Sequence, residues 1–369
     1  MLKRIYIDNY KCLVNFDLSL NQINLFLGPN GSGKSTLFEV LGKLQSFISG
    51  ESKVNSLFKY SDRCRWQTIL VQRFEIEYEH PEGLYKYELA IEHGEEGRIA
   101  KVKYERLFFN NKPLLEFENG NVQLYRIDHT SAPVYNFDWT QSAVASIFER
   151  PETKQLMWFK EQISGMVITQ VIPRMLDDTS DQENAVPASH FENFVSWYRF
   201  ISQDQGMTFR LQKVLQNVLP QFDSFKFELY GEQRRLLKVV FKDSINKSTI
   251  TYSFAELSDG QRMLIVLYSL LQAAQEKGYM ICIDEPENFL ALPEIQPWLV
   301  RLYDQCMEDK FQAILISHHP EMINYLLASP VGYWFDRQEN LSTRVMPIQT
   351  ENDGGVPISE LIARGWLHD

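Results

Sequence analysis

The chain has 369 residues, 44% of them hydrophobic and 23% charged, which is typical of a globular protein with room for one or two domains. Acidic residues outnumber basic ones by 48 to 37, and the resulting net charge of −11 disfavours indiscriminate coating of nucleic acid. The four cysteines lack zinc-ligand spacing, no apolar run is as long as a membrane span, and the N-terminus resembles no secretory signal, so we expect a cytoplasmic protein.

The N-terminal region, residues 1–50, predicts strands, a phosphate-binding turn and a helix. Residues 23–27 form an apolar run typical of a buried strand, and 35–48 carry the apolar face of a helix. Between them, residues 28–35 read GPNGSGKS and fit the pattern G-x-x-x-x-G-K-[ST] in full. Glycines let backbone N–H groups converge on phosphate oxygens, and the helix N-terminus adds donors and a positive dipole end.

This pattern predicts binding of ATP and Mg²⁺ by one short stretch. We expect Lys34 to reach the β- and γ-phosphates and the Ser35 hydroxyl to ligate Mg²⁺. An ordinary glycine-rich turn is the alternative, but the turn lies between an apolar strand and a helix, as the motif requires. The candidate ATP-binding residues here are Asn30, Gly31, Ser32, Gly33, Lys34, Ser35 and Thr36.

The middle of the chain predicts antiparallel strands followed by helices. Residues 66–130 contain alternating apolar and polar runs separated by turn signals, which is typical of a β meander. Residues 140–220 form a predicted helical lobe insertion, with helices over 140–165, 190–203 and 207–218. The polar, acidic stretch 176–189 is the best candidate for a mobile loop.

The region 221–345 predicts strands and then an alternation of helices and strands. Strands are expected over 223–231, 235–242 and 247–253, followed by helix 258–277, strand 279–284, helix 293–308, strand 312–317, helix 320–328 and strand 331–336. Because such alternation builds a parallel sheet with crossover helices, we expect an α/β fold. The C-terminal tail, 346–369, carries a short amphipathic segment that packs on its own domain or docks a partner.

Two strand ends in this region carry polar side chains. The strand 280–283 is followed by Asp284 and Glu285, and ligands bind beyond the carboxyl ends of parallel strands. Asp284 is therefore the candidate Mg²⁺ ligand beside Ser35, and Glu285 the candidate base for the attacking water. His318, at the next strand end, is the candidate contact for the γ-phosphate. The alternatives are a helix-capping acidic pair and a structural histidine.

A further motif, LSDGQ at 257–261, precedes the long helix before the acidic strand. The order of the four motifs resembles the ABC ATPase family. The resemblance implies that Leu257, Ser258, Asp259, Gly260 and Gln261 present a helix N-terminus to the ATP held by a second subunit. It implies a homodimer around two Mg-ATP, with ATP hydrolysis by each site. A plain helix N-cap is the alternative for Ser258.

Two further stretches resemble the RecF/SMC/OLD-like branch of that family: IDNYK at 7–11 and EPENFL at 285–290. This branch implies a P-loop ABC-ATPase head over 1–369, with a mixed or parallel core sheet, an N-terminal antiparallel β subdomain and a helical lobe. It also makes Lys11 a candidate nucleotide contact. The chain lacks the heptads of SMC arms, and the segment after His318 is too short for the nuclease domain of OLD-type enzymes. The glutamine expected near Mg²⁺ stays open between Gln67 and Gln72.

Four functions fit these motifs to different degrees. The first is an ATPase switch that controls a separate effector, such as a nuclease or toxin, in a bacterial antiphage-defence or mobile-element module. The second is a RecF-like DNA-repair ATPase, for which the basic clusters 63–65 and 234–238 offer nucleic-acid contacts. A transporter subunit is disfavoured by the N-terminal pattern and the meander. A scaffold with little turnover is disfavoured by Glu285.

Overall fold

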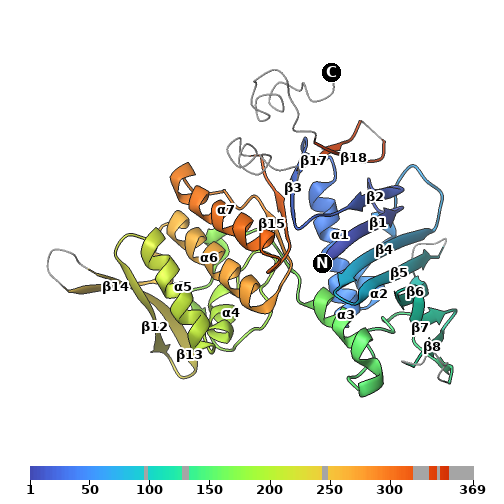
Figure 1. Ribbon diagram of the computed structural model, residues 1–369, viewed down its shortest axis with the longest axis horizontal. Helices are drawn as coiled ribbons and strands as arrows, with labels where there is room; N and C mark the ends of the chain where they lie inside the picture. The colour runs from blue at the N-terminus through green and yellow to red at the C-terminus, as the bar shows by residue number, and fades with distance from the viewer. Residues whose placement is uncertain (95–98, 127–132, 243–247, 319–331, 339–340, 349–369) are drawn as a thin grey trace. The chain divides into compact units, whose positions relative to one another are not determined.

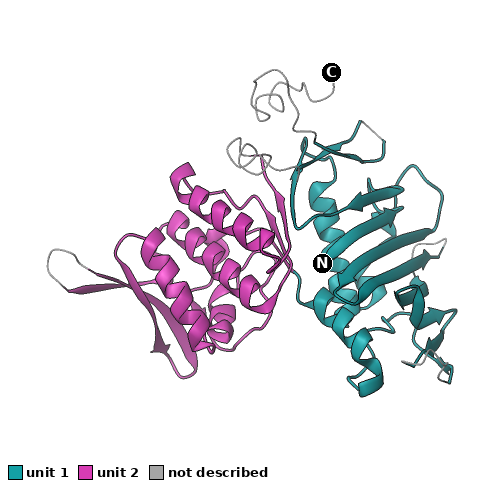
Figure 2. Cartoon of the chain, in the orientation of Figure 1, with its two compact units in different colours: residues 1–166, 330–349 teal, residues 167–329, 350–369 magenta. Residues whose placement is uncertain are grey.

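A computed structural model describes residues 1–94, 99–126, 133–242, 248–318, 332–338 and 341–348 (Figure 1). The chain divides into two compact units (Figure 2). Unit 1 comprises residues 1–166 and 330–349, and unit 2 comprises residues 167–329 and 350–369. In the described part of the chain, no helix combines the length and the apolar character needed to cross a bilayer.

The largest sheet of unit 1 is antiparallel and has eight strands in the order β2-β1-β4-β5-β6-β7-β8-β9. Its central strands largely alternate buried and partly exposed side chains because one face packs on the core. The predicted meander over 66–130 corresponds to the run from β4 to β8. The strands are β1 (Leu2–Asp8), β2 (Phe16–Ser19), β4 (Val71–His80), β5 (Gly83–His93), β6 (Ala100–Phe109), β7 (Lys112–Glu118), β8 (Asn121–Leu124) and β9 (Tyr135–Asn136).

The glycine turn of unit 1, residues 28–33, adjoins a second group of strands. Strand β3 (Ile23–Leu27) pairs in parallel with β17 (Gly332–Asp336), which pairs antiparallel with β18 (Arg344–Pro347). Helix α1 (Lys34–Ser49) follows the turn, and Gln45 on α1 donates hydrogen bonds to carbonyl groups at the end of α3 (Lys154–Ser164). A short helix, α2 (Val54–Leu57), lies between α1 and the meander.

The prediction of a helix over 140–165 is wrong for its first half. Only Lys154–Ser164 is α-helical, and residues 140–150 form turns. The reason is a tertiary contact: the carboxylate of Glu105 on β6, fully buried, accepts hydrogen bonds from Ser142 Oγ and Ala143 N, each at 2.6 Å. Tyr87 donates a third bond to Glu105 at 2.8 Å. This buried carboxylate binds the segment to the sheet, which a helix over the same residues would prevent.

Unit 2 contains three parallel strands, β10 (Val167–Thr169), β15 (Ile281–Asp284) and β16 (Ala313–Ile316), with β15 between the other two. The helices α6 (Asp259–Lys277) and α7 (Leu292–Met307) connect β15 to its neighbours in the chain, and Trp298 Nε1 on α7 donates to the Leu267 carbonyl on α6 at 3.2 Å. The predicted parallel sheet with crossover helices is thereby confirmed for these elements. The predicted helix 320–328 lies outside the described residues.

The rest of unit 2 is a small antiparallel sheet with two helices, α4 (Phe194–Ile201) and α5 (Gln205–Val218). Strand β13 pairs with β12, β14 and β11, and the ring of Tyr198 on α4 packs at tilted angles against the rings of Phe225 and Phe227 of β12. The remaining strands are β11 (Thr179–Ser180), β12 (Phe222–Tyr230), β13 (Arg234–Lys242) and β14 (Thr249–Ser253).

The stretch 176–189, predicted to be a mobile loop, instead carries ordered contacts. Its strand β11 pairs with β13, and Ser180 is buried. Arg199 on α4 donates to Ser180 Oγ at 3.0 Å and lies 4.0 Å from Glu183. The acidic composition suggested a solvated loop, whereas these side chains pair with a cation that is remote in sequence.

Candidate nucleotide-binding site

The glycine turn of unit 1 joins β3 to α1, as predicted. All of β3 is buried, and α1 begins directly after Gly33, whose φ of 106° lies in the left-handed region. A Cβ at Gly28 would lie 2.1 Å from the carbonyl oxygen of Phe335 on β17, whereas a Cβ at Gly31 would meet no atom within 4 Å. Gly28 therefore permits close packing of β17, and Gly31 leaves the open backbone surface that a phosphate group requires.

The side chain of Lys34 folds back over this turn. Its Nζ donates to the carbonyl oxygens of Gly28 at 2.7 Å and Pro29 at 2.9 Å, and to Ser32 Oγ at 3.4 Å. Lys34 is buried, so its ammonium group lies among the oxygen atoms of the turn rather than in open solvent. These residues fit a triphosphate, because phosphate oxyanions are strong acceptors for a charged donor such as the Lys34 ammonium group.

The other predicted ATP contacts of unit 1 lie in and beside the first turn of α1. Ser35 is exposed, and Thr36 Oγ1 lies 4.0 Å from the sulfur of Cys12. Lys11, with φ 48°, donates from Nζ to Glu39 on α1 at 2.5 Å. Burial raises the pKa of Glu39, but the hydrogen bonds and charges around it, led by Lys11, hold that pKa below its usual value. Lys11 is thus an ion-pair partner of Glu39, and its contact with nucleotide stays a prediction.

The two glutamines left open by the sequence have different surroundings. Gln72 is fully buried, its Nε2 donates to the Asn9 carbonyl at 3.1 Å, and its Oε1 lies 2.9 Å from His93 Nε2. Gln67 is half-buried, and its Oε1 has no hydrogen-bond partner among the described residues. Both ends of Gln72 are therefore engaged in the core, and only Gln67 retains an unsatisfied acceptor.

Asn9 is a residue of this region that the sequence did not single out, apart from its place in the stretch 7–11. Its Nδ2 donates to the carbonyl groups of Ile69 at 2.8 Å and Val71 at 3.0 Å, and its Oδ1 accepts from Cys64 N at 3.1 Å. Asn9 is fully buried and has φ 60°. It anchors both ends of the segment that carries Gln67.

Arg337 is a second residue that no sequence motif marked. It follows β17, and its Nη1 donates to the carbonyl oxygen of Gly31 in the glycine turn at 3.3 Å. Its guanidinium carbon lies 5.8 Å from the centre of the ring of Trp66, whose side chain is 43% exposed. The fold thus adds a cation and an exposed aromatic ring to the surroundings of the turn.

In unit 2, Asp284 ends β15, as predicted, and Glu285 begins a turn. The Glu285 N–H donates to the Ile316 carbonyl on β16 at 2.8 Å, and Asn288 Nδ2 donates to Glu285 Oε2 at 2.8 Å. Glu285 has φ 51°, a left-handed conformation that costs a non-glycine residue on the order of 1 kcal/mol. One hydrogen bond thus fixes the backbone of Glu285 to β16, and another orients its carboxylate within the turn.

The LSDGQ motif forms the start of α6. Ser258 and Gln261 make a capping box: Gln261 N donates to Ser258 Oγ at 3.2 Å, and Ser258 N donates to Gln261 Oε1 at 3.0 Å. Asp259 accepts a hydrogen bond from Arg262 at 2.5 Å, Leu257 is buried, and Gly260 packs against the turn after β15. The plain N-cap weighed as an alternative does form. It leaves Ser258 exposed, with a hydroxyl proton available to donate.

His318 follows β16 in unit 2 and is exposed. Its backbone N–H donates to Glu287 Oε1 at 3.3 Å, and the hydroxyl of Ser317 donates to the same oxygen at 2.5 Å. Burial raises the pKa of Glu287, and the nearby charge of Glu285 adds to that increase. The next residue, His319, lies outside the described residues.

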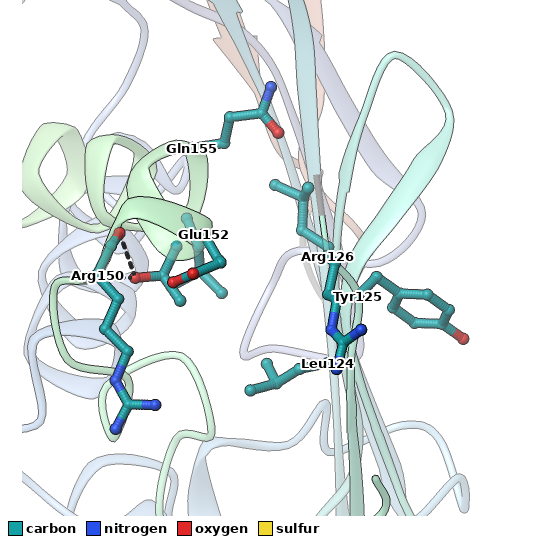
Figure 3. Close-up of a pocket in the computed structure, with 9 residues that line it drawn as sticks. Leu124, Tyr125, Arg126, Arg150, Glu152 and Gln155 are labelled. Carbon is teal, nitrogen blue, oxygen red and sulfur yellow. Dashed lines mark hydrogen bonds between the residues drawn. The ribbon is translucent and has the colours of Figure 1, made fainter. Parts of the chain in front are cut away.

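The predicted residues therefore divide between the two units. Unit 1 carries 30–36 and Lys11, and unit 2 carries 257–261, Asp284, Glu285 and His318. A cavity of about 550 Å³ lies elsewhere in unit 1, between the end of β8 and the start of α3, and is lined by none of them (Figure 3). Its walls mix leucines with Arg126, Arg150 and Glu152 from different elements. The chemistry of the residues, rather than the size of a cavity, identifies the glycine turn as the candidate site.

Two family profiles match the chain. The profile described as "AAA ATPase domain" matches residues 1–234, more than half of the chain. A second profile, described as "AAA domain, putative AbiEii toxin, Type IV TA system", matches residues 172–324. The matches agree with the motif order read from the sequence.

Curated relatives match short segments only. A "putative ABC transporter ATP-binding protein" of Clostridium acetobutylicum is 44% identical over 55 residues, which are 14% of this chain and 20% of that protein. An "OLD nuclease" of Thermus scotoductus is 42% identical over 41 residues, which are 11% of this chain and 8% of that protein. The chain thus spans a fifth or less of the length of these relatives.

Solved structures resemble the chain over nearly its whole length. The SmcHead bound to the C-winged helix domain of ScpA has a TM-score of 0.57 at 12% identity, covering 94% of this chain and 98% of that one. The Smc head domain bound to the C-terminal domain of ScpA derived from Pyrococcus furiosus has a TM-score of 0.54 at 11% identity, covering 94% and 96%. Such low identity shows the fold alone, and this fold is the predicted ATPase head. The chain therefore belongs to the AAA ATPase domain family, as an ATPase with an SMC-head-like fold.

Proposed function

We propose that this chain binds Mg-ATP, hydrolyses it and dimerises around two nucleotides. The observation that carries the proposal is the geometry of the glycine turn, where the buried Nζ of Lys34 donates to the carbonyl oxygens of Gly28 and Pro29 beside the open backbone at Gly31. This arrangement places a buried cation and unobstructed backbone donors where a triphosphate would bind.

Ser35 and Asp284 would hold Mg²⁺, and Gln67 is the glutamine that we infer to lie near it. All three offer oxygen atoms, which Mg²⁺ prefers, and the remaining ligands of Mg²⁺ at such sites are generally water and phosphate oxygens. When bound, the ion neutralises charge on the β- and γ-phosphates. Gln72 is excluded from this role because both ends of its side chain are engaged in the core.

Hydrolysis requires a group that orients and deprotonates water, and Glu285 is our assignment for that group. Its carboxylate is oriented by Asn288, so it is preorganised to accept a proton. His318 would contact the γ-phosphate, and Lys34 would stabilise charge that develops on the phosphate oxygens.

The dimer follows from the exposed tip of α6. A capped helix start with an exposed serine hydroxyl offers donors and a positive dipole end to an anion, and we assign that anion to the ATP of a second copy. Binding of ATP would then favour the dimer and hydrolysis would favour its separation.

The biological role we propose is control of a separate effector in the cytoplasm, in a bacterial antiphage-defence or mobile-element module. Support comes from the profile whose description includes a toxin–antitoxin system and from the segment shared with an OLD nuclease. The solved heads that share the fold are bound to a partner, ScpA, which is consistent with a head domain that acts on another protein.

The direct test is ATP binding and hydrolysis by Glu285→Gln. We expect this variant to bind Mg-ATP, hydrolyse it slowly and accumulate as an ATP-bound dimer in size-exclusion chromatography. Lys34→Ala is the companion variant and should lose nucleotide binding altogether. Hydrolysis by Glu285→Gln at the rate of the unmodified protein would remove Glu285 from its assigned role.

DNA binding of the RecF type is the second candidate function. One basic cluster is used internally, since Arg63 stacks on Tyr60 and donates to the Ile69 carbonyl. On the small sheet, Lys226 lies directly opposite Lys238, a like-charged pair that a bound anion would stabilise. A DNA affinity that falls steeply with salt and is weakened by Lys226→Glu would support this role.

A further inference from the structure

The turn 285–290 of unit 2 is fixed by hydrogen bonds within the turn and by hydrogen bonds to the end of β16. Glu285 and Phe289 both have positive φ, at 51° and 70°. Within the turn, Asn288 N donates to the Glu285 carbonyl at 3.2 Å, and Leu290 N donates to the Glu287 carbonyl at 3.1 Å. Two left-handed non-glycine residues so close together persist only where surrounding contacts fix them.

Glu287 is the side chain that ties this turn to the end of β16. It is 8% exposed, and its Oε1 accepts from Ser317 Oγ at 2.5 Å and from His318 N at 3.3 Å. Glu287 Oε1 therefore binds both Ser317 and His318, and His318 is the residue proposed to contact the γ-phosphate. A short hydrogen bond to a carboxylate is among the stronger polar contacts in proteins.

The other oxygen of Glu287 has a different environment. Oε2 is buried and has no hydrogen-bond partner among the described residues. An unsatisfied buried polar atom costs about 1–3 kcal/mol, so this carboxylate is not optimal for stability alone. A glutamine would keep one oxygen for Ser317 and His318 and place an amide nitrogen where Oε2 lies.

We propose that Glu287 is a positioning residue for the proposed hydrolysis: it sets the place of His318 relative to the turn that carries Glu285. The proposal rests on the function assigned above. Glu287 does not contact the phosphate itself. It acts through the backbone of His318, so its loss matters only while the His318 side chain is present.

The test is a double-mutant cycle of Glu287→Ala and His318→Ala, read as kcat and KM for ATP. Misplacing a reacting group by about 1 Å can lower a rate by about 100-fold, so Glu287→Ala should lower kcat by about 10- to 100-fold with little change in KM. Because Glu287 acts through His318, the double variant should be no slower than His318→Ala alone. Glu287→Gln, which keeps the accepting oxygen, should retain most of the activity.

A matched control separates positioning from folding. Glu294 caps α7 in the same unit, accepting from Ala291 N at 2.8 Å, so Glu294→Ala should lower the melting temperature and leave kcat unchanged. Ser317→Ala removes the 2.5 Å bond to Glu287 and gives a second route to the same kcat loss should Glu287→Ala not fold.

Three outcomes would overturn the proposal: Glu287→Ala at the unmodified rate, a double variant slowed by the product of the two single effects, or His318→Ala without effect. These results leave ATP hydrolysis itself intact. The proposed function fails by a different result, when Lys34→Ala and Glu285→Gln hydrolyse ATP normally.

Discussion

Gly260, in the first turn of α6, packs against the carbonyl oxygen of Phe289, so closely that a Cβ at position 260 would lie 3.0 Å from that oxygen. Phe289 belongs to the turn in which Asn288 orients Glu285. The resemblance to the ABC ATPase family interprets Gly260 as part of a helix N-terminus that is presented to the ATP of a second subunit. The structure adds an intrachain reason, since the start of α6 and the acidic turn touch within unit 2.

Replacement of Gly260 by Ala should therefore disturb the acidic turn of its own subunit. The added Cβ would push on a backbone carbonyl, which cannot rotate away as a flexible side chain does. We expect a fall of kcat by at least about tenfold, because the Glu285 carboxylate would move with the turn. Steady-state ATP hydrolysis and a melting curve would measure the effect.

Gly42→Ala is the control for this substitution. Gly42 lies within α1, and a Cβ there would meet no atom within 4 Å. Alanine favours a helix over glycine by about 0.5–1 kcal/mol, so the melting temperature should rise while hydrolysis stays unchanged. If Gly260→Ala turned over ATP as fast as Gly42→Ala, the contact with Phe289 would have no bearing on activity.

Substitutions of Ser258 can separate its capping role from its phosphate role. Ser258→Ala removes the acceptor for Gln261 N and should cost about 1 kcal/mol of stability. Ser258→Asp restores a good N-cap but places a negative charge at the helix tip, facing the proposed γ-phosphate. We expect Ser258→Asp to melt like the unmodified protein and to fail to dimerise with ATP in light scattering. If Ser258→Asp still dimerised with ATP, Ser258 would act only as the N-cap of α6.

Mixing two inactive variants tests whether the sites are shared between copies. Lys34→Ala lacks the nucleotide-binding lysine, and Ser258→Arg blocks the helix tip. A mixed dimer of the two has one site built wholly from unmodified parts, so mixing should restore hydrolysis that neither variant has. Lys34→Ala mixed with Glu285→Gln is the control, because each of its two sites keeps a defect. Equal rates from both mixtures would contradict the shared arrangement, unless hydrolysis needs both sites intact.

His93 predicts a pH dependence of stability in unit 1. Burial lowers its pKa from 6.5 to about 4, and its Nε2 lies 2.9 Å from Gln72 Oε1 in the core. The unfolded chain binds this proton at higher pH than the folded chain does, so stability is lost as the pH falls from about 6.5 towards 4. Between pH 7 and pH 5 this site should cost about 2 kcal/mol of the free energy of unfolding. Urea titrations of the unmodified protein and of His93→Gln would measure it, and an equal pH dependence in both would rule His93 out.

Local patterns in the sequence were sufficient for several elements. The turn before Lys34, the start of a helix at Ser258 and the acidic end of β15 were predicted in place, because each depends on residues within a few positions of one another. The helix expected over 140–165 was half wrong, because the carboxylate that binds 142–143 comes from Glu105 on a distant strand. No window along the chain contains that information.

The sequence by itself determined the ATPase motifs, their order and the α/β class, because phosphate binding and helix capping are local chemistry that short runs of residues encode. Only the tertiary structure showed that both ends of the Gln72 side chain are engaged in the core and that Asn9 holds the segment carrying Gln67. It also brought Arg337 to the glycine turn and joined Glu287 to Ser317 and His318. Those relationships are hydrogen bonds between residues far apart in the chain. They exist because folding buries polar groups that must then find partners, and the partner is set by packing rather than by spacing in the sequence.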